Sequence, residues 1–259
     1  MTTPPFALSE PTGPEGRPLL VLGHSLGTGT LLWENALPAL ASEYRVTLLT
    51  LPGHEGAPVP AEPFTLAELA DAVAGAAAEL GRGAFLYAGV SIGGALGLEL
   101  ALRHPDRVRA AAIIASAASL GDAEHWEARA ELVRRQSPAI LVAPSSKTWF
   151  APDSYANEPV ITGRILRTLQ ATPAEGYARC AEALARYDLR PRLGEIEVPL
   201  LAVWGEFDTV APEERQDEIV AGARRARKAR IDGAAHQPPA EQPAATAELL
   251  LEFFAEVAR

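Results

Sequence analysis

The sequence is poor in cysteine, with Cys180 as the single example among 259 residues. One cysteine cannot form an intrachain disulfide and has no partner for a C-x-x-C metal motif, so a reducing cytoplasm is the simplest location. Long apolar runs are also lacking, since none approaches the roughly 18 residues of a transmembrane helix. Residues 1–17, rich in proline and glycine, lack the charged-then-apolar order of a signal peptide. We therefore expect a soluble, cytoplasmic protein with no membrane partner.

Positive charge is scarce as well: 23 lysines and arginines stand against 33 acidic residues, which gives a formal net charge of −10 at pH 7. An acidic chain repels phosphate backbones, so we expect no nucleic-acid partner. The basic stretch at residues 224–228 is then better explained as an exposed helix end. Any anionic substrate would need a cation placed close to it. The composition leaves the oligomeric state open.

Hydrophobic residues make up 48% of the chain and charged residues 22%, values close to the globular average. Short apolar runs bounded by turn residues alternate with longer helix-like stretches, which is typical of repeated βα units. The strands are predicted at residues 19–22, 46–49, 84–89, 111–115, 200–204 and 226–231. We therefore predict an α/β fold with a mainly parallel sheet flanked by helices.

Helical stretches lie between these strands. Residues 66–80 are the clearest, because Thr65 can cap the start, Glu68 follows three residues on and Gly81 marks the end. Further helices are predicted at residues 92–103 and 246–258.

The spacing changes between residues 120 and 198, which have helical patterning and no convincing strand. This stretch is predicted to be a helical cap, inserted in a core formed by residues 1–119 and 199–259. Its helices are predicted at residues 121–135, 159–169 and 172–187, separated by the segments around Pro144 and Pro152.

A G-x-S-x-G motif places Ser91 between Gly89 and Gly93, directly after a predicted strand and before a predicted helix. On such a strained turn the glycines remove side-chain clashes, and the helix N-terminus offers N–H groups to an oxyanion. Ser91 is therefore the candidate nucleophile. The motif also arises by chance, and a glycine-rich connection without chemistry would look alike.

A serine hydroxyl needs a base, so one of the five histidines must reach Ser91. His236 alone follows the last predicted strand, ahead of the closing helix, and is the candidate base. The others have plain structural explanations or lie in the predicted cap: His24, His54, His104 and His125.

Asp208 is the candidate for the carboxylate that orients the histidine. It follows the apolar run at residues 199–205, and the carboxyl ends of strands are where α/β sheets bind ligands. The chain order Ser91, Asp208, His236 is that of hydrolases with a G-x-S-x-G turn. Three other carboxylates stay open as alternatives: Glu206, Asp232 and Asp122.

The loop after the first predicted strand, residues 23–28, is placed to supply a second oxyanion donor. By position, the Leu26 N–H would join the N–H of Ile92, the residue after the nucleophile. Without Ser91, the same loop would be interpreted as a simple glycine- and serine-rich connection.

Three motifs together resemble the α/β-hydrolase superfamily: G-H-S-L-G-T at residues 23–28, L-P-G-H-E-G at 51–56 and G-V-S-I-G-G at 89–94. More narrowly, the first motif and residues 116–129, which lead into the predicted cap, are similar to 3-oxoadipate enol-lactonases. Further points of likeness are Trp33, Trp149 with Phe150, residues 188–190 and residues 205–210. The likeness covers nearly the whole chain from Pro18 onward.

The sequence departs from those enzymes at two places. They open with a β-hairpin ahead of the first motif, whereas only a proline- and glycine-rich leader precedes Leu19 here, which leaves open whether edge strands exist. The segment after His236 reads Q-P-P-A-E rather than a mix of polar and apolar residues.

The resemblance implies a serine hydrolase that opens a small carboxylated enol-lactone through an acyl-enzyme, giving 3-oxoadipate, with no metal or organic cofactor. The substrate carboxylate needs a cation, and arginine binds carboxylates in a bidentate way. The predicted cap supplies Arg129, Arg134, Arg135 and Arg164. Arg129, one helical turn from Trp126, is the candidate anchor, and Trp126 is the candidate apolar wall.

Other functions are compatible with the same motifs. The triad would equally serve a general carboxylesterase, a carbon–carbon bond hydrolase or a perhydrolase, since function depends on the site and not on the fold. The chain could also be a ligand receptor that keeps the fold without turnover. Substrate preference separates the enzymes from one another, and removal of the Ser91 hydroxyl separates them from a receptor.

Overall fold

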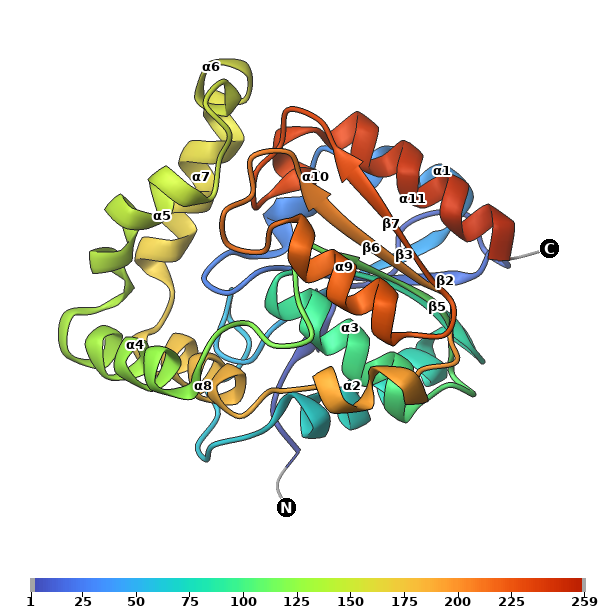
Figure 1. The fold of residues 1–259 in the computed structure, drawn as a ribbon, viewed down its shortest axis with the longest axis horizontal. Coiled ribbons are helices and arrows are strands. Elements are labelled where there is room, and N and C mark those ends of the chain that lie inside the picture. The colour runs from blue at the N-terminus through green and yellow to red at the C-terminus, as the bar shows by residue number, and fades with distance from the viewer. Residues whose placement is uncertain (1–2, 258–259) are drawn as a thin grey trace.

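The computed structural model describes residues 3–257, in which a seven-stranded sheet carries helices on both faces (Figure 1). The strands are β1 (Ala7–Leu8), β2 (Leu19–Gly23), β3 (Arg45–Thr50), β4 (Phe85–Val90), β5 (Val108–Ile114), β6 (Leu200–Gly205) and β7 (Ala226–Ile231). Their order is β1-β3-β2-β4-β5-β6-β7, and only the pair β1 and β3 is antiparallel in the described part of the chain. The mainly parallel sheet predicted from the sequence is confirmed.

The central strands are continuous apolar runs because helices cover them on both sides. Every residue of β2, β4 and β6 is buried. β5 begins three residues before its predicted start at residue 111, because Val108 already pairs with Phe85 of β4. The loops after the parallel strands leave the sheet at one edge, and this brings together segments that are distant in sequence.

An edge strand does precede β2, which answers the question that the resemblance left open. The two residues of β1 pair with Thr50 and Leu49 of β3, and Thr12 forms a further bridge to Val46. The strand is short because its surroundings are rich in proline, which has no N–H to donate to a sheet.

Helices lie on both faces of the sheet: α1 (Leu37–Glu43) and α11 (Pro243–Val257) on one, and α2 (Leu66–Gly81), α3 (Ile92–Arg103) and α9 (Glu213–Gly222) on the other (Figure 1). α2 begins as predicted, because the Thr65 side chain accepts a hydrogen bond from the Glu68 N–H and Glu68 accepts one from the Thr65 N–H. It ends one residue later than predicted, since Arg82 and not Gly81 takes the left-handed conformation, with φ 53°.

Residues 120–198, predicted to be a cap, contain helices and no strand, and they stand to one side of the sheet (Figure 1). The helices are α4 (Ala123–Gln136), α5 (Val142–Thr148), α6 (Ser154–Asn157), α7 (Pro159–Ala171) and α8 (Ala174–Ala185). The sequence predicts neither α5 nor α6. Pro144, expected between helices, lies in the first turn of α5, where the missing N–H of proline has no helical partner to lose.

The C-terminal helix α11 begins at Pro243, three residues before its predicted start, and Ala258 of the predicted helix lies outside the described residues. The short helix α10 (Pro238–Glu241) accounts for the P-P-A-E segment after His236, since proline fits the first positions of a helix. Within residues 3–257, no helix is long and apolar enough to span a membrane. Nor could any cluster of three or more His, Cys, Asp or Glu side chains in this range hold a metal ion.

Candidate active site

Ser91 occupies the sharp turn between β4 and α3, as the G-x-S-x-G motif predicts. Its φ is 56° and its ψ is −116°, a conformation that residues other than glycine rarely adopt. The Ser91 N–H donates to the Ile114 carbonyl at 2.9 Å, and the Ser91 carbonyl accepts from the Ala95 N–H at 2.9 Å and the Ser116 hydroxyl at 2.7 Å. These bonds hold the backbone of the turn in its strained shape.

Close backbone contacts explain the two glycines of the motif. A Cβ atom on Gly89 would lie 2.3 Å from the Gly93 carbonyl oxygen, and one on Gly93 would lie 2.9 Å from the His24 carbonyl oxygen. Both separations are shorter than real Cβ contacts. Neither position can carry a side chain unless the turn moves, which is the physical reason for the pattern.

The two residues predicted to donate to an oxyanion lie next to Ser91. Leu26, in the loop at residues 23–28, lines the same cavity as Ser91. Ile92 is the first residue of α3, so its N–H has no partner within the helix. No hydrogen bond of the described chain uses the Leu26 N–H. The two amides are therefore available to a ligand.

His24 and His54 brace the loop at residues 23–28. His54 Nε2 accepts the Gly27 N–H at 3.0 Å, and His24 Nε2 accepts the Leu51 N–H at 3.1 Å, so each histidine binds the backbone of the other's loop. Each Nδ1 faces a carbonyl of its own loop. Burial lowers the pKa of His24 to about 4, and burial, with the neighbouring His24 ring as a further cause, lowers the pKa of His54 to about 3. Both rings are therefore neutral at pH 7 and have a structural role, as predicted from the sequence.

His236 and Asp208 form a buried pair. His236 Nδ1 lies 3.1 and 3.2 Å from the two carboxylate oxygens of Asp208. Asp208 also accepts the N–H of Val210 at 2.8 Å and of Ala211 at 3.0 Å. Burial alone would raise the pKa of Asp208, but His236 and the two amides hold that pKa below its ordinary value. Asp208 is thus a carboxylate at neutral pH, and it orients the ring so that Nε2 faces away from it.

The alternative acids and His104 have other partners. Glu206 and Asp122 accept backbone N–H groups, and Asp122 does so as the N-cap of α4. Asp232 binds the guanidinium of Arg230 at 2.7 Å. His104 binds Asp71 at 2.8 Å. Among the candidate acids, only Asp208 contacts His236 in the described chain.

Ser91 and His236 line one small cavity of about 50 Å³. Ser25 and Leu26 border it from the core. The remaining wall residues are Leu120, Trp126, Arg129, Trp149, Tyr177 and Val210. The cavity therefore gathers the predicted nucleophile, the predicted base and both predicted substrate contacts. The sequence did not mark Tyr177 as a wall residue, because a tyrosine within a helix is more often part of a core.

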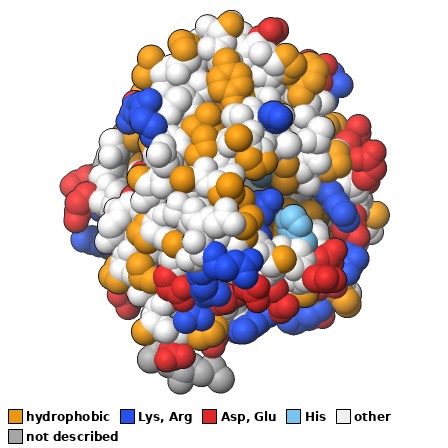
Figure 2. Space-filling view, turned by 90° about the vertical axis from the view of Figure 1, so that its left-hand side faces the viewer, with side chains coloured by type: hydrophobic (Ala, Val, Ile, Leu, Met, Phe, Trp, Pro, Cys, Tyr) orange, Lys and Arg blue, Asp and Glu red, His pale blue; other side chains and the backbone are white. Residues whose placement is uncertain are grey.

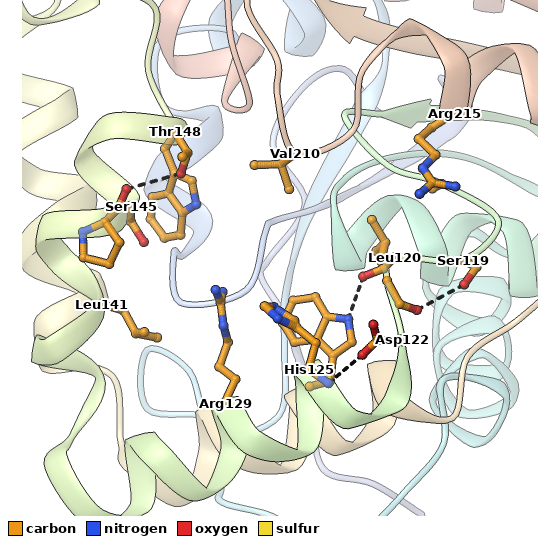
Figure 3. A pocket seen from close by; sticks show the side chains of 15 residues that line it. Ser119, Leu120, Asp122, His125, Arg129, Leu141, Ser145, Thr148, Val210 and Arg215 are labelled. Carbon is orange, nitrogen blue, oxygen red and sulfur yellow. Dashed lines mark hydrogen bonds between the residues drawn. The ribbon is translucent and has the colours of Figure 1, made fainter.

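A wider cavity of about 450 Å³ borders the first and shares several of its wall residues, among them Trp126 and Arg129. Figure 3 shows Arg129 and His125 extending into this space from α4, with Arg215 on the opposite side. Figure 2 faces the side of the molecule that carries the helices of residues 120–198, and Lys or Arg side chains lie on both sides of a histidine near its middle. Arg215 could not be identified from the sequence, because no motif in α9 sets it apart.

Arg129 differs from the three other arginines considered as anchors. Their partners are Glu175 and Glu182 for Arg134, Glu131 for Arg135 and Glu34 for Arg164. Arg129 has no carboxylate within 4.0 Å in the described chain, and its guanidinium lies 5.3 Å from the centre of the Trp126 ring. The charge of Arg129 is therefore free to bind an anion in the cavity.

Known proteins are similar to this chain in sequence and in fold. A family model described as the alpha/beta hydrolase fold matches residues 18–141. A 3-oxoadipate enol-lactonase of Acinetobacter baylyi is 33% identical over 211 residues, which are 81% of this chain and 79% of the relative. The crystal structure of an enol-lactonase from Burkholderia xenovorans has a TM-score of 0.91 and 30% identity, with 96% of each chain covered.

Esterases are also among the relatives. A pimeloyl-[acyl-carrier protein] methyl ester esterase of Neisseria meningitidis is 31% identical over 258 residues, which cover 93% of this chain and 94% of the relative. Lactonases and methyl ester esterases are thus both similar to this chain.

Proposed function

The chain belongs to the α/β-hydrolase family, and within that family we propose that it is a serine hydrolase that opens a small carboxylated enol-lactone. The substrate that fits best is 3-oxoadipate enol-lactone, which would yield 3-oxoadipate. The observation that carries the proposal is one cavity lined by Ser91, His236 and the guanidinium of Arg129, whose charge no carboxylate of the described chain neutralises. The similarity to the two enol-lactonases supports the choice of substrate.

In the proposed first step, the Ser91 hydroxyl attacks the lactone carbonyl. His236 takes the hydroxyl proton on Nε2, because Nδ1 is held by Asp208. The N–H groups of Leu26 and Ile92 stabilise the negative charge that forms on the carbonyl oxygen. The strained Ser91 backbone keeps the hydroxyl in place without a reorganisation step.

Ring opening and hydrolysis follow by the same groups. The C–O bond of the lactone breaks, and the departing enol oxygen takes the proton from His236. The enol becomes a ketone, which makes reclosure of the ring unfavourable. His236 then removes a proton from water, the resulting hydroxide attacks the acyl-enzyme, and the acid leaves as Ser91 regains its proton. None of these steps uses a metal or an organic cofactor.

The helical segment at residues 120–198 is proposed to act as a cap that sets specificity. Arg129 would bind the substrate carboxylate, and Trp126 would form an apolar wall beside the ring. The unpaired state of Arg129 supports this, because the formal net charge of −10 would otherwise repel an anionic substrate.

Replacing the proposed nucleophile (Ser91→Ala) tests the reaction. We expect the parent protein to hydrolyse the enol-lactone with a higher kcat/KM than p-nitrophenyl acetate, and Ser91→Ala to lose roughly 10⁴-fold or more in kcat on both. Thermal unfolding of the variant serves as the control for folding. Parental activity in Ser91→Ala would remove Ser91 as nucleophile, and a parent inactive on every ester and lactone would favour a ligand receptor.

A methyl ester or general carboxylesterase is the second candidate, favoured by the similarity to the Neisseria meningitidis esterase. The same triad would cleave a simple ester, and the wider cavity of about 450 Å³ has room for a longer acyl chain than a lactone ring needs. A strong preference for simple esters over the enol-lactone would select this candidate. Carbon–carbon hydrolysis and perhydrolysis would be selected by activity on a vinylogous diketone or with peroxide.

A further inference from the structure

Glu241 is a buried carboxylate for which the proposed mechanism has no use. It is 3% exposed and lies at the end of α10, shortly after His236 in the chain. Its Oε1 atom accepts two hydrogen bonds, from the N–H of Ala235 and from the N–H of Gln237, both at 2.9 Å. One oxygen of Glu241 therefore binds the two residues that flank the proposed base.

The second oxygen of Glu241 binds a different part of the chain. Its Oε2 atom accepts the Ala151 N–H at 2.6 Å and the Ser154 hydroxyl at 2.7 Å. Ala151 lies between α5 and α6, and Ser154 is the first residue of α6, both within residues 120–198. In the described chain no Lys or Arg lies within 4.0 Å of Glu241, so hydrogen-bond donors alone compensate its charge.

Two further contacts tie the His236 loop to the rest of the site. The His236 N–H donates to the carbonyl of Trp149, whose side chain lines the cavity. Gln237 Oε1 accepts the hydroxyl of Ser25, in the loop proposed to form the oxyanion site. Ala235, His236 and Gln237 therefore each form hydrogen bonds. Through Glu241 and Trp149 they are linked to residues 149–154, and through Ser25 to the loop at residues 23–28.

A buried charge of this kind is a poor means of gaining stability. Burial raises the pKa of the Glu241 carboxyl even though four donors oppose the shift, which shows that keeping the charge inside is costly. A well-packed apolar side chain would fill the same space without that cost. Glu241 instead provides two acceptor oxygens that point to two separate segments, and a carboxylate is the smallest group that can do so.

We propose that Glu241 is a positioning residue that fixes the His236 loop to the segment at residues 149–154, so that the ring of His236 stays aligned with Ser91. This inference rests on the proposed function, in which His236 is the base. It also couples the cap to the chemistry, since the residues that carry Trp149 into the cavity are held by the same carboxylate.

A graded series of substitutions tests this role. Glu241→Ala removes all four acceptor contacts, and we expect kcat per active site to fall about tenfold to a hundredfold, because a small displacement of a catalytic group has that effect. In Glu241→Gln the amide oxygen can still accept from Ala235 and Gln237, and the amide nitrogen can donate to the Ser154 hydroxyl, so only the Ala151 N–H loses its acceptor. The His236 side of the contact is kept, and kcat is expected within about threefold of the parent. KM is expected to stay within about twofold in both, because neither change touches the substrate.

The measurements use p-nitrophenyl acetate as substrate, with active sites counted by titration with a fluorophosphonate so that unfolded protein does not enter kcat. The low-field proton resonance of His236 Nδ1–H reports the bond to Asp208, and we expect it to shift in Glu241→Ala. Glu99→Gln is the matched control: Glu99 is also buried, with its pKa raised by burial, but it lies on α3 and forms no hydrogen bond with residues 235–237. It should leave kcat and the resonance unchanged.

The results separate the two proposals. If Glu241→Ala keeps the parental kcat per titrated site and the parental resonance while only its melting temperature falls, Glu241 is structural and the inference is wrong. If Glu241→Ala does not fold, Glu241→Met, which keeps the side-chain volume, is judged by the same criteria. Failure of the proposed function would appear earlier, as parental activity in Ser91→Ala, and does not depend on any Glu241 variant.

Discussion

The loops at the carboxyl edge of the sheet and the helices of residues 120–198 hold their polar side chains in different ways. At the sheet edge, buried Asp208 binds His236 and two backbone amides. In the helices, Arg134 binds Glu175 and Glu182 with 30% of its side chain exposed. Exposed ion pairs contribute roughly 0–1 kcal/mol, whereas breaking a buried pair costs about 3–5 kcal/mol. The sheet edge therefore fixes one geometry, and the helical segment can exchange residues at little cost to stability.

The largest effect is expected at the buried pair of Asp208 and His236. Asp208→Asn keeps the shape of the side chain but replaces one acceptor oxygen by an NH2 group, which is a donor. The groups that bind Asp208 are themselves donors: the Nδ1–H of His236 and the N–H groups of Val210 and Ala211. We expect kcat to fall roughly 10⁴-fold with little change in KM, since the ring would lose its tautomer and orientation. Steady-state kinetics measure both constants. A loss smaller than about tenfold would mean that another carboxylate, with Glu206 the first to test, orients the base.

A smaller effect, on stability, is expected from the two histidines that brace the loop at residues 23–28. In the folded chain their pKa values are lowered to about 4 for His24 and about 3 for His54, whereas an unfolded histidine has a pKa near 6.5. As pH falls below 6.5, the unfolded chain binds protons that the folded chain does not, so the free energy of unfolding decreases until the folded values are reached. We expect a loss on the order of 1 kcal/mol per pH unit for each histidine, measured by urea unfolding between pH 7 and about pH 4.

Replacing one of the two histidines isolates its contribution to the pH dependence of the free energy of unfolding. His54→Gln cannot titrate in this range, so the slope of stability against pH should fall to about half of the parental slope. The variant should also lower kcat, because the Gly27 N–H would lose the acceptor that fixes its loop. A slope equal to that of the parent would show that His54 takes up a proton in the folded chain and does not act as a neutral brace.

The sheet-edge half of the site could be predicted from the sequence because each of its residues follows a strand. Ser91 comes directly after β4, Asp208 follows β6 and His236 follows β7; apolar runs mark β4 and β6, whereas β7 carries three basic residues and is the weaker pattern. Carboxyl ends of parallel strands share one edge, so chain order alone indicates that these loops meet. His24 and His54 also follow strands, β2 and β3, and His236 could be chosen because it alone follows the last strand, β7.

The other half could not be predicted, because its residues reach the site through packing between distant segments. Tyr177 enters from α8 and Arg215 from α9, two helices whose placement no local pattern fixes. Glu241 lies in a Q-P-P-A-E segment that suggests a polar turn, yet one of its donors is Ala151, 90 positions away. Arg129 could be proposed only as one of four arginines, because the carboxylates that pair with Arg134 and Arg164 come from distant parts of the chain.

The smallest effect is expected at Arg129, and it tests the helical segment rather than the sheet edge. Arg129→Met removes the charge but keeps an unbranched stem against Trp126. We expect kcat/KM for the carboxylated enol-lactone to fall about tenfold to a hundredfold, as for the loss of a charged hydrogen bond, and that for p-nitrophenyl acetate to stay within about twofold. Arg134→Met is the control and should change neither, because the charge of Arg134 already binds two glutamates. Equal losses on both substrates in Arg129→Met would mean that this side chain shapes the cavity. Specificity for the carboxylate would then have to come from the core side, where Arg215 faces the same space.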